Sequence, residues 1–103
     1  MYLKAGNWNG KQIITSDWIN ASVTPSASVT RLIKYGYKWW LIPYGTDDTK
    51  YAWCCRGFGD QSAIIIPEFD IVAVFTGWNI IENGPSLDSS EPIRRIVSAV
   101  LDK

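Results

Sequence analysis

The sequence predicts an α+β fold: an antiparallel β-meander with a C-terminal helix packed on one face and a short helix near the N-terminus. Runs rich in aromatic and β-branched residues alternate with turn residues through the middle of the chain. The C-terminal segment repeats apolar residues at helical spacing. The 103 residues, of which 47% are hydrophobic and 19% charged, suffice for one domain, 1–103, with its own core.

A turn and a short helix are expected first. Residues 6–11 hold two glycines and two asparagines, which supply the positive φ values of a tight turn, and residues 12–14 continue as an extended segment. Thr15 or Ser16 can act as the N-cap of a helix, with Asp17 in its first turn, where a carboxylate favours the helix dipole.

This helix is expected to bury one side against the rest of the chain. Three of its apolar residues should face inward: Trp18, Ile19 and Val23. Pro25 lies where a helix normally stops. Residues 24–34 have mixed polarity and are expected to form a surface loop.

Four strands are expected to follow, at residues 35–43, 51–55, 61–66 and 71–76. Residues 45–50 form the first turn, and the glycine-containing segment 56–60 breaks the second strand. Residues 67–70 have the composition of a turn. A strand, a four-residue turn and another strand predict a β-hairpin over 61–76.

A loop over 77–89 and a helix over 92–101 complete the prediction. The helix has one apolar face, made of Ile93, Ile96, Val97, Val100 and Leu101. Pro92 lies in the first turn, where its missing N–H costs nothing, and Ser89 or Ser90 is the expected cap. Arg94 and Arg95 should be solvated on the outer side.

The residues that commonly carry chemistry are scarce. Without histidine, the chain cannot by itself hold a Ser-His-Asp triad, a Cys-His pair or a His-ligated metal. Cys54 and Cys55 are adjacent, so on a strand they point to opposite faces and an ordinary disulfide is disfavoured. They are small apolar residues in or near the core, or else redox or nucleophilic groups. Asp47 and Asp48 indicate a turn rather than a metal site, and no metal or cofactor is expected.

The charge balance and the apolar runs exclude further classes. Ten basic and ten acidic residues give a net charge of zero, which argues against nucleic-acid binding, including an RNA-binding sheet with stacked aromatics. No apolar run approaches the roughly 18 residues that span a bilayer. The N-terminus lacks the apolar region of a secretion signal, so a signal of any secreted parent would lie outside this chain.

Three segments have a characteristic order and spacing. They read YGYKWWL at 35–41, RGFGDQ at 56–61 and IPEFDIVAVFTG at 66–77, and residues 3–18 add the string GNWNGKQII and Trp18. Together, from about residue 2 to 101, they resemble the C-terminal part of the serine β-lactamase-like hydrolases, which include class C β-lactamases, penicillin-binding proteins and esterases. The resemblance implies a partial β-lactamase-like fold.

The resemblance also identifies what this chain lacks. The family uses a Ser-x-x-Lys nucleophile motif, a Tyr-x-Asn-type motif and a Lys-Thr-Gly-type strand, because the serine needs a nearby proton acceptor and the strand contributes to the oxyanion hole. None of the nine serines precedes a lysine by three positions, and Tyr-x-Asn is absent. The third motif matches at Cys55, Arg56 and Gly57, with cysteine for lysine and arginine for threonine. Asp60 replaces a glycine common before Gln61 in relatives.

We therefore expect no catalytic residue in this chain. Cys55, Arg56 and Gly57 would be a remnant of a substrate wall, in which Gly57 allows a ligand to approach. The alternative is a glycine-rich bend whose Arg56 and Asp60 are merely solvated. The tryptophans have two interpretations as well: a sugar- or peptide-stacking surface, or core packing plus an uncovered domain interface. They are Trp8, Trp39, Trp40 and Trp53.

The resemblance implies partners too. In the family, the final meander pairs with strands from the N-terminal part of the enzyme, so the strand at 71–76 should have a free edge here. The sequence predicts a C-terminal fragment, or a separately encoded segment, of such a hydrolase, inactive alone. The alternative is a small binding or assembly module that self-associates or recruits a partner through the free edge or an aromatic face.

Overall fold

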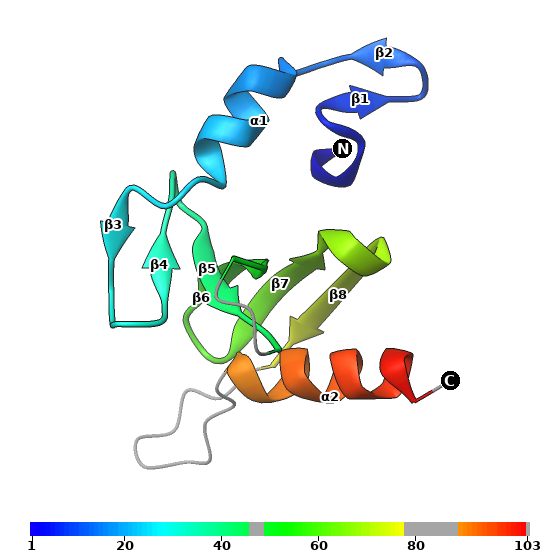
Figure 1. Ribbon diagram of the computed structural model, residues 1–103. Coiled ribbons are helices and arrows are strands. Elements are labelled where there is room, and N and C mark those ends of the chain that lie inside the picture. Colours follow the sequence, from blue (N-terminus) through cyan, green and yellow to red (C-terminus); the bar gives the residue numbers. More distant parts are fainter. Residues whose placement is uncertain (46–48, 78–88, 103) are drawn as a thin grey trace.

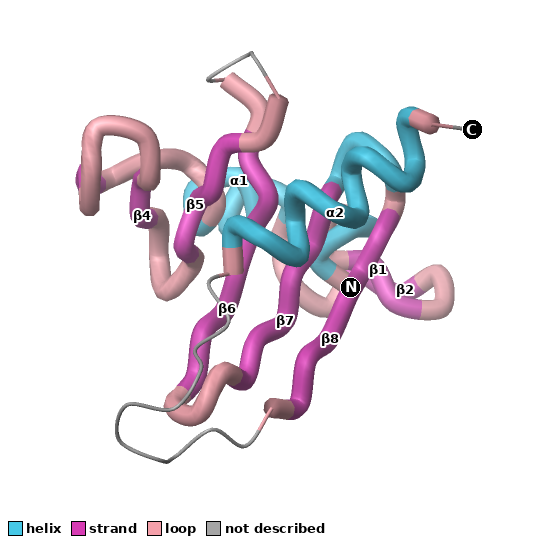
Figure 2. The backbone as a smooth tube through the Cα atoms, turned by 90° about the horizontal axis from the view of Figure 1, so that it is seen from below, coloured by secondary structure: helices cyan, strands magenta, loops and turns pink. Residues whose placement is uncertain are grey.

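A six-stranded antiparallel sheet forms the body of the protein in the computed structural model, which describes residues 1–45, 49–77 and 89–102 (Figure 1). Each strand pairs with its neighbours in the sequence, as in a meander. The strands are β3 (Ala27–Ser28), β4 (Lys34–Tyr35), β5 (Trp40–Pro43), β6 (Tyr51–Gly57), β7 (Gln61–Ile66) and β8 (Ile71–Thr76). A C-terminal helix, α2 (Ser90–Leu101), lies across one face (Figure 2). The predicted α+β class is confirmed.

An N-terminal unit precedes the sheet. It consists of a 3-10 turn, η1 (Tyr2–Lys4), a two-stranded hairpin of β1 (Asn7–Trp8) and β2 (Lys11–Gln12), and the helix α1 (Ser16–Ser22). The predicted turn is confirmed, with Gly6 and Gly10 at φ values of 89° and 78°. The predicted N-cap is confirmed as well, since the Thr15 side chain accepts a hydrogen bond from the backbone N–H of Trp18.

The inward face of α1 is narrower than predicted. Ile19 is buried and Val23 is half-buried, but Trp18 is 52% exposed. A seven-residue helix turns only one stripe toward the chain, and here the stripe is Ile19 and Ser22, one turn apart. The Trp18 ring instead lies 5.5 Å from the ring of Tyr37 on the surface.

The predicted loop at 24–34 and the predicted strand at 35–43 both need correction. The loop contains β3 and pairs with β4, and the strand is two strands, β4 and β5, joined by a turn. In this turn the Gly36 N–H donates to the Trp39 carbonyl, and Lys38 has a φ of 68°. Aromatic content predicts strand but does not detect a reversal inside an aromatic run.

The predicted strand at 51–55 is longer in the structure, as β6, and the predicted strand at 61–66 matches β7. β6 continues through Arg56 and Gly57 in register with Ser62 and Gln61, so the predicted break at 56–60 is wrong by two residues. The turn is tighter because Asp60 adopts a left-handed φ of 63°. The hairpin at 61–76 is confirmed, with six residue pairs in register between β7 and β8 and a 3-10 turn, η2 (Pro67–Phe69), between them.

The main core lies between the sheet and α2. Its buried residues are Ile42, Tyr44, Ala52, Cys54, Ile64, Ile66, Ile93 and Val97. The predicted apolar face of the C-terminal helix is confirmed for Ile93 and Val97, whereas Leu101 is 66% exposed in the last turn. The predicted loop at 77–89 falls almost wholly outside the described residues, as does part of the turn at 45–50.

A smaller core lies on the opposite face of the sheet. There the N-terminal unit covers Trp39, Leu41 and Ile65, and the rings of Tyr2 and Trp39 are 4.9 Å apart. Lys4 of η1 forms a 3.6 Å ion pair with Asp70. This cover stops short of the last strand, because Val72 and Val74 of β8 remain 57% and 65% exposed. One face of the sheet is therefore only partly covered in the described structure.

Candidate functional site

The three residues that match the third hydrolase motif lie together at the end of β6. Cys55, Arg56 and Gly57 border an open surface cavity of about 370 Å³. Gln61 of β7 and Thr76 of β8 line the same cavity, because the register pairs Gly57 with Gln61 and Gln61 with Thr76. The candidate substrate wall is thus a continuous strip across the ends of three strands.

The side chains of this strip do not converge. Cys54 is fully buried toward α2, so Cys55 points to the opposite face, where it is exposed. Arg56 points to the α2 side, and its guanidinium lies 5.3 Å from the centre of the Trp40 ring. A ligand on one face of the sheet can therefore meet the side chain of Cys55 or of Arg56, but not both.

Neither cysteine is prepared for nucleophilic chemistry. Burial raises the pKa of the Cys54 thiol, and this outweighs the opposing effects of a hydrogen bond with Ser89 and the charge of Arg56. Partial burial also raises the pKa of the Cys55 thiol. A cysteine nucleophile reacts as the thiolate, which a raised pKa disfavours at neutral pH. Both thiols are free, and the apolar interpretation fits Cys54, while Cys55 is exposed.

Arg56 is more than a solvated side chain. Its guanidinium stacks on Trp40, whose ring meets that of Tyr35 edge-on at 5.4 Å. A cation over an indole face is an attractive contact, worth about 0.5–1 kcal/mol at exposed sites. This stacking directs Arg56 toward Trp40 on the α2 side of the sheet. A structural role can therefore explain why the residue is arginine, without a role in binding a substrate.

Gly57 has no packing reason to be glycine in the described structure. A Cβ atom at this position would lie 3.5 Å from the Cβ of Gln61, an ordinary contact, and the backbone is not left-handed. Asp60 is different, because its φ of 63° belongs to the region that glycine adopts most easily. The glycine of the resembled family would thus be unstrained where this chain has aspartate.

A polar cluster that the sequence did not indicate lies at the other end of the sheet. The Tyr44 hydroxyl donates to Glu68 Oε2 at 3.1 Å, and Lys50 Nζ donates to Glu68 Oε1 at 2.8 Å. Burial, the hydrogen bond with Glu68 and the charge of Glu68 raise the pKa of Tyr44 to about 12. A surface cavity of about 450 Å³ borders this cluster together with Tyr51 and Trp53. Lys50 and Glu68 lie in segments whose composition predicts turns, and Tyr44 directly follows a predicted strand, so the sequence pattern does not link the three.

The topology explains this cluster. Because β6 and β7 are antiparallel, the turn before β6 and the turn after β7 lie at the same end of the sheet. Lys50 and Glu68 occupy these two turns and meet there. In this cluster the Glu68 carboxylate accepts hydrogen bonds from both partners, and the raised pKa keeps the Tyr44 phenol protonated at neutral pH. The hydrogen bonds of the cluster connect the end of β5, the start of β6 and η2.

The tryptophans among the described residues do not form one platform. Trp39 is buried under the N-terminal unit and Trp40 packs toward α2, so these two neighbours face opposite sides of the sheet. Trp53 is half-buried beside the smaller core, and Trp8 is exposed on the N-terminal hairpin. In the described part of the chain, Trp18 and Tyr37 form an exposed ring pair, which the sequence did not indicate.

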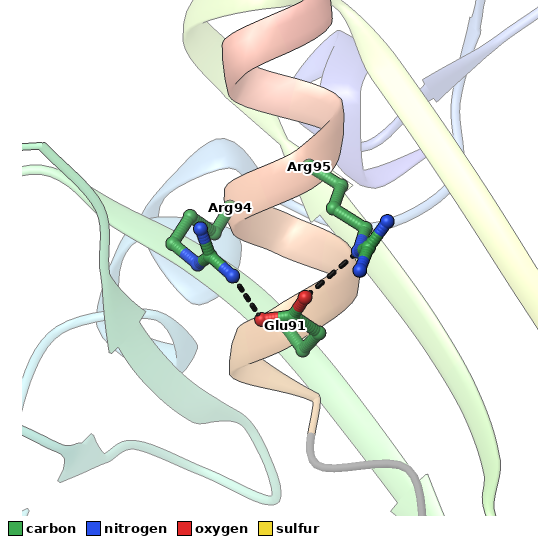
Figure 3. A network of polar contacts seen from close by, with 3 residues as sticks. All are labelled: Glu91, Arg94 and Arg95. Atoms are coloured by element: carbon green, nitrogen blue, oxygen red, sulfur yellow. Dashed lines mark hydrogen bonds and ion pairs between the residues drawn. The ribbon is translucent and has the colours of Figure 1, made fainter.

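On the outer side of α2, Glu91 holds two arginines. Arg94 and Arg95 are exposed, as predicted, and both donate to the Glu91 carboxylate, the second at 2.7 Å (Figure 3). These hydrogen bonds lower the pKa of the Glu91 carboxyl group. The spacing of three and four residues is the one at which helical side chains meet. The three residues form a local ion-pair network on the outer surface of the first turns of the helix.

Few other chemical possibilities remain in the described residues. Residues 1–45, 49–77 and 89–102 contain no group of three or more His, Cys, Asp or Glu side chains that could hold a metal ion. Asp47 and Asp48 lie outside this part of the chain. Neither α-helix of the described structure is long and apolar enough to cross a membrane. No family model and no curated protein matches the chain.

Proposed function

We propose that the chain is a sheet-bearing C-terminal segment of a serine β-lactamase-like hydrolase and does not turn over substrate by itself. The observation that carries this proposal is the position of Cys55, Arg56 and Gly57. They lie at the end of an interior strand and border an open cavity that Gln61 and Thr76 extend. A strand that lines a substrate site needs such a position, with its backbone accessible from one side.

The chemistry must come from residues outside this chain. None of the nine serines has the lysine spacing that the family uses, and Cys55 is a poor replacement because its pKa is raised. Arg56 is held against Trp40 on the other face. What this segment would contribute is a rigid wall: an interior strand, a glycine that a ligand could approach, and a packed core behind it.

The coding sequence immediately upstream tests the proposal directly. We expect an in-frame Ser-x-x-Lys motif followed by a Tyr-x-Asn-type motif. A stop codon and a separate promoter directly before Met1 would contradict a fragment of a longer enzyme and favour a standalone module, because no segment with a nucleophile would then belong to the same polypeptide.

A second function, a small assembly module, is favoured by a different observation. β8 is the last strand of the sheet, and its Val72 and Val74 are largely exposed. An open strand edge beside exposed apolar side chains favours pairing with another strand. Sedimentation velocity over a concentration series tests it: a sedimentation coefficient that rises with concentration supports it, and a constant monomer value contradicts self-association.

A further inference from the structure

We propose that β8 pairs with β8 of a second copy of this chain, antiparallel, around a two-fold axis at Ala73. This inference rests on the assembly function proposed above and names its partner and register. In the described structure, β8 hydrogen-bonds to β7 on one side only. On its other side, alternate N–H and C=O groups point away from the sheet, so that a further strand could satisfy them.

The edge lacks the features that normally prevent such pairing. Proteins protect edge strands with lysine, proline, bulges or inward-facing charges. β8 reads IVAVFT, with no charged residue and no proline, and its six pairs with β7 run without a bulge. Nothing in the composition of β8 therefore opposes pairing with a second β8 strand.

The two faces of β8 determine which registers are possible. Ile71, Ala73 and Phe75 are half-buried toward the main core, whereas Val72 and Val74 are exposed on the other face. A two-fold axis perpendicular to the sheet keeps each face on its own side. Odd-numbered residues must therefore lie opposite odd-numbered ones, and even-numbered residues opposite even-numbered ones.

The axis at Ala73 gives the best match among these registers. It brings Val72 of one copy opposite Val74 of the other, and Ile71 opposite Phe75, so five consecutive pairs are apolar. Asp70 then lies opposite Thr76, so no two like charges meet. An axis at Val74 would instead pair Val72 with Thr76 and move Ile71 opposite Gly77.

The rest of the molecule is compatible with a second copy at this edge. The net charge of zero means that two copies have no long-range repulsion to overcome.

Cysteine cross-linking tests the register. In a Cys55→Ser background, which removes the exposed thiol, Val72→Cys and Val74→Cys chains are oxidised separately and as an equimolar mixture. We expect disulfide-linked dimers in the mixture and few in either sample alone, because position 72 of one copy lies opposite position 74 of the other, and neither position lies opposite itself. Efficient cross-linking of Val74→Cys alone, or no preference for the mixture, would overturn the inference.

A charge substitution separates this register from association in general. Val74→Lys is expected to weaken dimerisation about tenfold or more, because it places a charge opposite an apolar side chain. Val29→Lys is the matched control, since Val29 is similarly exposed but distant from β8 in the sheet order, and it should leave the sedimentation unchanged. Circular dichroism checks that both variants fold. Monomers at every concentration would refute both this inference and self-association, whereas dimers insensitive to Val74→Lys would refute the β8 pairing alone.

Discussion

The hydroxyl group of Tyr44 donates a 3.1 Å hydrogen bond to the carboxylate of Glu68, 24 residues further along the chain. Lys50 binds the other oxygen of the same carboxylate. The contact ties the end of β5 to the turn between β7 and β8, at the end of the sheet opposite the candidate substrate wall. It also gives the sheet a titratable group whose effect on stability has a definite sign.

The Tyr44 phenol is expected to titrate near pH 12, above its ordinary value of 10.0. Because the folded pKa is the higher one, the folded state holds this proton more tightly than the unfolded state. The resulting stabilisation is complete below pH 10 and is lost as the pH rises from 10 to 12. Absorbance at 295 nm after rapid pH jumps should show a tyrosinate component near pH 12 that Tyr44→Phe lacks.

Glu68→Gln tests the causes of this shift. It should move the Tyr44 pKa part of the way back toward 10, because burial, the larger cause, remains. A Tyr44 titration unaffected by Glu68→Gln would show that the hydrogen bond does not influence the phenol.

The Glu91 carboxyl group is expected to titrate below its ordinary range, because Arg94 and Arg95 donate to its charged form. Its contribution to stability is present above the ordinary pKa and is lost as the pH falls through the lowered one. Carbon-detected NMR of the carboxyl group should show the pKa rising in an Arg94→Gln/Arg95→Gln variant. Arg31→Gln, which changes a distant exposed arginine, is the control and should have no effect.

Gly36 is expected to be intolerant of any side chain. A Cβ atom there would lie 2.2 Å from the carbonyl oxygen of Ser22, which accepts a hydrogen bond from Tyr37. Gly36→Ala should reduce the free energy of unfolding by about 2–3 kcal/mol, measured by urea denaturation, since the backbone must move. Gly57→Ala is the matched control and should be nearly neutral, because its Cβ would have ordinary contacts. Equal losses at both glycines would contradict this account.

Ile64 should be the most informative core position in the sheet. Its side chain is fully buried between β7 and α2. Ile64→Ala is expected to lower the free energy of unfolding by about 2–5 kcal/mol, through lost burial and the cavity left behind. Val29→Ala, at a side chain that is 47% exposed, should change it by less than about 0.5 kcal/mol. A small loss at Ile64 would mean that α2 does not pack on the sheet as described.

The parts of the fold that follow from local patterns could be predicted from the sequence. The hairpin at 61–76 and the C-terminal helix have clear periodicity and turn residues, and both are present. The reversal between β4 and β5 was missed because its cause is not local. Gly36 is needed there by the nearby Ser22 carbonyl, and no pattern within 35–43 reveals that contact. The same holds for Trp18, whose exposed position depends on which side of α1 meets the sheet.

In the candidate site too, the features that follow from local alternation could be predicted, and those that depend on the strand topology could not. Alternation along a strand correctly predicted that Cys54 and Cys55 face opposite sides. The same alternation implies that Cys55 and Arg56 lie on opposite faces, and in the structure Arg56 indeed stacks on Trp40 on the α2 side. The cluster of Tyr44, Lys50 and Glu68 required the strand topology as well, because its members come from three separate segments.

The most direct test of the central claim is the reaction of the purified chain with a fluorophosphonate, together with nitrocefin and p-nitrophenyl ester assays. The account predicts no turnover above the blank and no mass adduct on the 11.6 kDa chain, since the residues that activate a serine are missing. Turnover that the fluorophosphonate abolishes, with an adduct on a serine whose alanine variant is inactive, would contradict it.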